Sequence, residues 1–250
     1  MDGVLSQEEI NALLNNNDAA DSSDEILTES EKDAIGEIAN ISMGTAATTL
    51  FSLVNRRVEI STPVVSFSNW DKIVDEYEKP CVFIKIGYTQ GLNGSNILVL
   101  KEKDVKIITD LMMGGDGTNI NGEIGELHLS AISEAMNQMM GSSATSLSSM
   151  LNRTIDISPP IAEVVDLKNT LNEGEIDSFL SEEFVKISFR MEIGDLVDSE
   201  IMQLYPPAFV KEMCKGVSQN MELDTQSVTE DVHQSSNTAT QAAPIQQPQD

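Results

Sequence analysis

The sequence predicts an α+β fold with internal pseudo-twofold symmetry. Residues 33–63 and 130–160 are two copies of one stretch, aligned without a gap and 97 residues apart. Each copy has a helix pattern that runs into a strand pattern, and a strand–turn–strand pattern and a helix follow it. We therefore predict two related halves, each ordered helix, strand, hairpin, helix. Three largely antiparallel strands from each half would be covered by the helices.

Each copy begins with an Ala-rich amphipathic run of about 20 residues. Its apolar positions recur at helical spacing, at Ile35, Ile38 and Ile41 in the first copy and at Ile132, Met136, Met139 and Met140 in the second. Thr28 and Glu31 are spaced as a capping box, so the first helix is predicted to begin there. Alternating β-branched runs at 57–61 and 154–158 predict the strand that follows each helix.

A Glu and an Asn stand three residues apart in both helices, Glu37 with Asn40 and Glu134 with Asn137. This spacing places both side chains on one face, about one turn apart and away from the apolar face. A single exposed pair of this kind is usually only a solvated surface. Both copies, however, keep the pair and the same 22-residue distance to a proline. The repetition favours a function.

This spacing resembles the signature of the CheC/FliY family of bacterial chemotaxis phosphatases, in which Asp or Ser is followed by Glu, Asn and a distant Pro. The matching residues are Asp33, Glu37, Asn40 and Pro63 in the first copy and Ser130, Glu134, Asn137 and Pro160 in the second. The resemblance implies a CheC-like duplicated domain with both long helices displayed on one side of the sheet. It also implies hydrolysis of the aspartyl phosphate of phosphorylated CheY.

In the mechanism that the resemblance implies, Asn40 or Asn137 orients the attacking water, and Glu37 or Glu134 pairs with a lysine of the partner. The chain needs no cofactor of its own, because Mg²⁺ belongs to the partner's active site. Asp33 and Ser130 are expected to make helix-end or supporting hydrogen bonds, and Pro63 and Pro160 to shape the fold.

The residues themselves are compatible with this chemistry. The chain has no GxxxxGK[ST] loop and no GxSxG nucleophile motif. A carboxamide can hold a water in line with phosphorus, and phosphoryl transfer depends mainly on positioning and charge stabilisation. If the partner supplies the phosphoryl group, Mg²⁺ and a lysine, this chain would need to supply only the group that orients the water.

Residues 1–14 predict a short amphipathic helix, joined to the rest by a polar linker at 15–27. Ser6 begins a capping box, Leu5 and Ile10 are spaced as a hydrophobic staple, and Leu13 and Leu14 extend the apolar edge. Such a helix could bind a partner's groove or dock on its own domain. The segment is similar to the N-terminal phospho-CheY-binding peptide shared by FliM and FliY switch proteins, which favours the partner.

The remaining elements follow the repeat. Strands at 82–88 and 96–100 form a hairpin, and a helix at 102–113 ends at Gly114 and Gly115. The second half repeats this order with strands at 184–192 and 199–204, a turn at Gly194, and a helix opening at Pro206. The stretch from 63 to 80, with Trp70, is expected to be irregular.

The predicted domain spans 28–216, with halves at about 28–118 and 119–216, and 217–250 forms a polar tail. In FliY proteins a tail of this kind leads into a FliN-like domain that joins the flagellar switch ring. That domain is absent from this sequence. With it, FliM, FliG and FliN-type proteins would be partners, and the location would be the cytoplasmic face of the flagellar basal body.

A net charge of −26 argues against nucleic-acid binding and against an anionic membrane surface. No apolar run is long enough to insert into a membrane. Cys81 and Cys214 are expected to be buried or half-buried thiols. Two alternatives stay open: a non-enzymatic switch adaptor that binds phospho-CheY through residues 1–14, and a phosphatase that acts on another response regulator.

Overall fold

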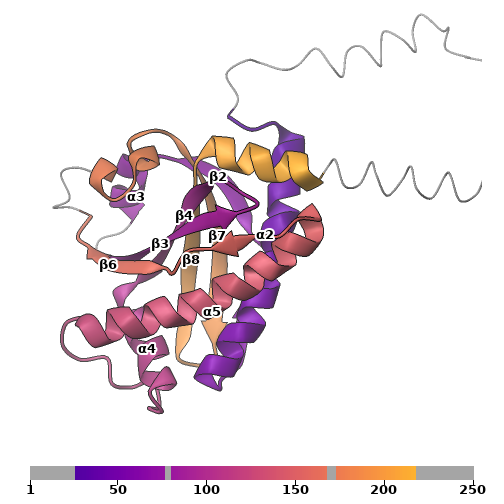
Figure 1. Cartoon of the computed structure of the whole chain (residues 1–250). Helices are drawn as coiled ribbons and strands as arrows, with labels where there is room; N and C mark the ends of the chain where they lie inside the picture. The colour runs from indigo at the N-terminus through magenta and orange to yellow at the C-terminus, as the bar shows by residue number, and fades with distance from the viewer. Residues whose placement is uncertain (1–25, 77–79, 168–172, 218–250) are drawn as a thin grey trace, which may run out of the picture.

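The fold was examined in a computed structural model of the whole chain (Figure 1). The structure describes residues 26–76, 80–167 and 173–217. The predicted N-terminal helix, residues 15–25 of the linker and residues 218–250 of the tail lie outside these ranges.

Within the ranges that the structure describes, an antiparallel sheet of eight strands, four from each half, forms the centre of the domain. The first half supplies β1 (Val58–Ile60), β2 (Val64–Ser68), β3 (Cys81–Gln90) and β4 (Gly94–Lys101). The second half supplies β5 (Asp156–Ile157), β6 (Ile161–Val165), β7 (Phe184–Ile193) and β8 (Val197–Tyr205). The strand order is β1-β7-β8-β4-β3-β5, with β2 also paired to β7 and β6 also paired to β3.

The two halves exchange strands across this sheet. The hairpins β3–β4 and β7–β8 meet at the centre, where β4 pairs with β8. The short strands β1 and β2 of the first half pair with β7 of the second. The short strands β5 and β6 of the second half pair with β3 of the first. The pseudo-twofold symmetry is therefore built from interlocked halves.

Helices cover both faces of the sheet. The main core joins one face to α2 (Glu29–Val54), α4 (Glu102–Met112), α5 (Glu126–Leu151) and the helix at 207–217. A second, smaller core lies on the other face, under α3 (Trp70–Glu76) and the 3₁₀ turns η1 (Glu173–Glu175) and η2 (Ser178–Ser181). The two long helices α2 and α5 pack side by side (Figure 1). A hydrogen bond of 2.8 Å from Thr49 Oγ1 to Ser142 Oγ joins them.

Burial on both faces explains why the hairpin strands are apolar at consecutive positions. In β3, Val82 and Ile84 face the main core, while Cys81 and Phe83 face the smaller one. Successive side chains of a strand point to opposite faces, so a strand covered on both sides has no need of polar alternation. The ring of Trp70 meets Phe83 edge-on, with ring centroids 6.0 Å apart.

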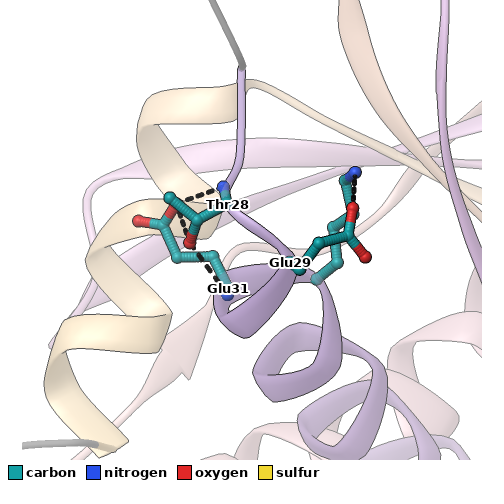
Figure 2. Close-up of polar contacts among 4 residues, drawn as sticks. Thr28, Glu29 and Glu31 are labelled. Carbon is teal, nitrogen blue, oxygen red and sulfur yellow. Dashed lines mark hydrogen bonds and ion pairs between the residues drawn. The ribbon is translucent and has the colours of Figure 1, made fainter. Parts of the chain in front are cut away.

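The predicted start of the first helix is confirmed. Thr28 Oγ1 accepts a hydrogen bond from Glu31 N at 3.2 Å, and Thr28 N donates to Glu31 Oε2 at 2.9 Å (Figure 2). Both predicted hairpins, the helix before Gly114 and the helix after Pro206 are also confirmed.

Three expectations were wrong. Residues 63–80 are not irregular, because they contain β2 and α3. The described residues of each half form four strands rather than three; the prediction missed β2 and its counterpart β6. Ile41 was expected on the apolar face, but 43% of it is exposed, because α2 turns that position away from the sheet.

Candidate active site

The fold accounts for many of the residues that the two copies share. Ile35 and Ile132 are buried in the main core, as are Leu50 and Leu147. Thr48 Oγ1 donates to the Gly44 carbonyl, and Thr145 Oγ1 to the Gly141 carbonyl, within their own helices. These residues would be kept by packing and helix geometry alone.

Two shared asparagines end the long helices. Asn55 has φ 49° and ψ 37°, and Asn152 has φ 47° and ψ 40°, so both adopt the left-handed conformation. Asn tolerates this conformation better than most residues other than Gly. Each asparagine ends its helix and turns the chain towards the short strands that pair with the opposite half.

Two shared serines attach those strands to the opposite half. Ser61 N donates to the Arg190 carbonyl and Ser61 Oγ accepts from Arg190 N, both at 2.9 Å. In the same way, Ser158 N donates to the Gly87 carbonyl at 2.8 Å, and Ser158 Oγ accepts from Gly87 N at 3.1 Å. Each serine lies two residues before a motif proline, so it fixes where that proline lies. We did not single out these serines from the sequence, although their identity in both copies was the signal that could have found them.

The Glu/Asn pairs have no comparable structural role. Glu37 and Asn40 are exposed on α2, and Glu134 is exposed on α5. None of the three belongs to either core. Since burying these residues does not stabilise the domain, their repetition is left to be explained by an activity at the surface.

The first pair lies in a cleft of about 370 Å³ between α2 and the start of β2. The lining residues are Glu29, Lys32, Asp33, Gly36, Glu37, Asn40, Thr62, Pro63 and Val65. All four predicted motif residues of the first copy are therefore brought together, with Pro63 facing the helix across the cleft.

The second pair lies in a cleft of about 420 Å³ between α5 and the start of β6. The lining residues are Leu129, Ser130, Ser133, Glu134, Asn137, Pro159, Pro160, Ile161 and Ala162. All four predicted motif residues of the second copy meet here as well. The clefts are counterparts in the two halves.

The clefts differ in charge. The first contains Lys32, which forms an ion pair with Glu29 and has its Nζ 5.3 Å from the centre of the Phe67 ring. Figure 2 shows Glu29 beside the capping box at the start of α2. The counterpart of Lys32 in the second cleft is Leu129. The second cleft is therefore less charged at this position.

The clefts also differ in how their Glu and Asn side chains are held. Glu134 Oε1 accepts a hydrogen bond of 2.7 Å from Gln138 Nε2 on the next turn of α5. The counterpart of Gln138 is Ile41, which cannot make this bond. Asn137 is half-buried whereas Asn40 is exposed. We expected both asparagines to be exposed, so the expectation for Asn137 was wrong. Asn137 lines a cleft that Pro159, Pro160 and Ile161 close from the other side.

Among the residues that the structure describes, no three His, Cys, Asp or Glu side chains are grouped to hold a metal ion. Cys81 and Cys214 are buried thiols, as predicted. Burial raises the pKa of each thiol to about 11, which makes them poor nucleophiles at neutral pH. The predicted partner-binding residues Leu5, Ser6, Ile10, Leu13 and Leu14 lie outside the described residues.

A family model described as the CheC-like family matches residues 31–67 and 127–164, which carry both Glu/Asn pairs. The solved structure of Thermotoga maritima FliY is 40% identical in sequence, with a TM-score of 0.72. The match covers 78% of this chain and 99% of that one. The chain belongs to the CheC-like family.

Two Bacillus subtilis proteins are similar to this CheC-like chain. The flagellar motor switch phosphatase FliY is 47% identical over 218 residues, which are 85% of this chain and 57% of that protein. The CheY-P phosphatase CheC is 24% identical over 143 residues, which are 55% of this chain and 67% of that protein. The chain thus spans little more than half the length of that FliY. In the described part of this CheC-like chain, no helix is long and apolar enough to cross a membrane.

Proposed function

We propose that this protein hydrolyses the aspartyl phosphate of phosphorylated CheY and so ends a chemotaxis signal. The observation that carries the proposal is the duplicated Glu/Asn pair. Each pair lies at the surface, in a cleft, with no part in either core. The named phosphatases among its relatives support the choice of reaction.

In the proposed reaction, the exposed face of α2 or α5 docks against the partner's phosphorylated aspartate. The amide oxygen of Asn40 or Asn137 accepts a hydrogen bond from a water and directs it at the phosphorus, opposite the aspartyl oxygen. The new P–O bond forms with this water as the bond to the aspartate breaks, which releases inorganic phosphate and a free carboxylate. Positioning of the water is the main contribution of this chain.

Glu37 and Glu134 would fix the register of the complex. A carboxylate one turn before the asparagine can pair with a lysine ammonium beside the partner's phosphoryl group. The partner's active site would also supply Mg²⁺, so this chain would need no cofactor of its own. Asp33 and Ser130, one turn further towards the helix start, line the clefts and would support this contact.

Residues 1–14 would recruit the same partner. The predicted amphipathic helix would bind phosphorylated CheY and raise its local concentration near the clefts through the polar linker. Partners at the flagellar switch, of the FliM, FliG and FliN types, and a location at the cytoplasmic face of the basal body belong to the same proposal. The similarity to a flagellar motor switch phosphatase supports both.

The test is the decay of ³²P-labelled phospho-CheY from the same organism. We expect the protein to accelerate the decay, and the double variant Asn40→Ala, Asn137→Ala to lose about 100-fold or more of the acceleration, because a misplaced water attacks the phosphorus poorly. The variant should keep its far-UV circular dichroism. A matched control is the double variant Thr48→Ala, Thr145→Ala, which changes exposed residues at equivalent positions of the same helices.

Two results would overturn the proposal. One is unchanged decay with the unmodified protein alongside tight binding of phospho-CheY, which would leave a switch adaptor. The other is a double Asn variant that loses its fold, which would make the asparagines structural. If the protein accelerates the decay of a different phosphorylated response regulator but not of phospho-CheY, the substrate is that regulator and the proposed hydrolysis reaction still holds.

A further inference from the structure

We infer that Gln138 is a positioning residue for Glu134 and that it makes the second cleft the tighter-binding of the two. This inference rests on the proposed function and goes beyond it, because it ranks the two sites by a contact that only one of them has. Gln138 does not belong to the shared set of motif residues, and its counterpart is Ile41.

The contact is specific in its direction. A carboxylate only accepts hydrogen bonds, so it requires the NH₂ group of the Gln138 amide to face it. The observed bond, from Gln138 Nε2 to Glu134 Oε1 at 2.7 Å, meets that requirement. Because the two residues are four apart on α5, the bond holds the carboxylate along the helix, towards the next turn, which also carries Asn137.

The neutral amide restrains Glu134 without neutralising it. A lysine or arginine at position 138 would compete with a cation on the partner, whereas an amide leaves the negative charge available. The hydrogen bond uses Oε1 of Glu134, which leaves Oε2 as an acceptor for a partner. A glutamate side chain held in this way loses less rotamer freedom when a partner's lysine binds it.

The first cleft lacks this restraint. Ile41 offers no hydrogen-bond donor, and within the described ranges the structure records no hydrogen bond to the Glu37 carboxylate. Asn40 is also exposed, whereas Asn137 is half-buried against the rim formed by Pro159, Pro160 and Ile161. Glu37 and Asn40 therefore have to be ordered when the partner binds, and the second cleft has part of that order beforehand.

The experiment uses two single-site proteins, Asn40→Ala, which leaves the second cleft, and Asn137→Ala, which leaves the first. In the Asn40→Ala protein, Gln138→Met keeps the side-chain length and removes the donor. We expect it to raise KM for phospho-CheY about twofold with little change in kcat. A twofold change corresponds to the free energy of one hydrogen bond between neighbouring side chains on a helix. Gln138→Glu, which replaces the donor with a second carboxylate, should raise KM further.

The reciprocal change tests the same idea in the other cleft. In the Asn137→Ala protein, Ile41→Gln creates the missing donor and should lower KM about twofold. Rescue in this direction would not follow from a purely structural role of Gln138. Ser149→Ala, at an exposed position of α5 three turns away from Gln138, is the matched control for a general effect of substitution on that helix.

A second measurement separates failure of this inference from failure of the proposed function. The side-chain NH₂ resonances of Gln138 in a ¹⁵N spectrum should shift in the Glu134→Gln variant, because that variant removes the carboxylate that accepts their hydrogen bond. An unchanged KM in Gln138→Met, or NH₂ resonances that ignore Glu134, would overturn the inference. If the unmodified protein fails to accelerate the decay while the resonances respond to Glu134, the proposed function fails and the contact remains.

Discussion

At the scale of single residues, the two copies separate structural identities from functional ones. Ser61 and Ser158 are identical because each attaches a short strand to the opposite half through two hydrogen bonds. Glu37 and Glu134 are identical although neither supports the fold. A shared residue that has a structural explanation needs no other, and a shared residue without one points to a site.

The serine attachments give a prediction with an internal control. Ser158 is half-buried and Ser61 is exposed. Ser158→Ala leaves Gly87 N without its acceptor, so we expect the free energy of unfolding to fall by about 1 kcal/mol. Ser61→Ala should cost less, because water can replace the lost hydroxyl at Arg190. Urea denaturation measures both, and equal losses would contradict the role of burial.

At the scale of elements, the ends of the long helices determine where the clefts form. The capping box of Thr28 and Glu31 sets the start of α2. The left-handed Asn55 and Asn152 turn the chain back so that the short strands return along the same helix and place Pro63 and Pro160 opposite the Glu/Asn pairs. The cleft is thus a product of a helix and the strand that follows it.

The helix ends can be tested with a matched pair of substitutions. We expect Asn152→Ala to lower the free energy of unfolding by about 1 kcal/mol, because alanine is strained in the left-handed conformation. Asn152→Gly should change it little, because glycine adopts this conformation readily. Chemical denaturation decides the matter. Equal losses for Ala and Gly would mean that the asparagine side chain, rather than the backbone conformation, is what matters.

Local signals made part of this architecture predictable. The capping box at Thr28 and the glycine-containing turns of both hairpins are determined by residues close together in the sequence, so the elements they define were predicted. The strands β2 and β6 were missed because each follows directly on a proline and is defined by pairing with a hairpin of the other half. The half-burial of Asn137 was missed for the same reason, since it depends on Pro159 and Pro160 returning across α5.

At the scale of the whole molecule, strand exchange makes each half depend on the other. β1 and β2 have β7 as their partner, and β7 lies in the second half. A fragment of residues 28–118 keeps the helix and hairpin of the first half and loses that partner. The same holds for a fragment of residues 119–217, in which β5 and β6 lose β3.

We therefore expect neither fragment alone to give a cooperative thermal transition as a monomer, because each leaves apolar strand edges and half a core exposed. Mixed at equal concentration, the fragments should form a one-to-one complex with the circular dichroism of the intact domain. Analytical ultracentrifugation together with thermal denaturation measures this. A folded, monomeric 28–118 fragment would show that the exchanged strands are dispensable.

The exchange also bears on how such a protein could arise. A chain with a single copy would offer the same open strand edges to a second molecule of itself, and the present domain is what two such molecules would become if joined end to end. Identical subunits must carry every mutation twice, whereas joined copies can change one at a time. The two copies show such a difference: the second has Gln138 beside Glu134, and the first has Ile41 at the equivalent position.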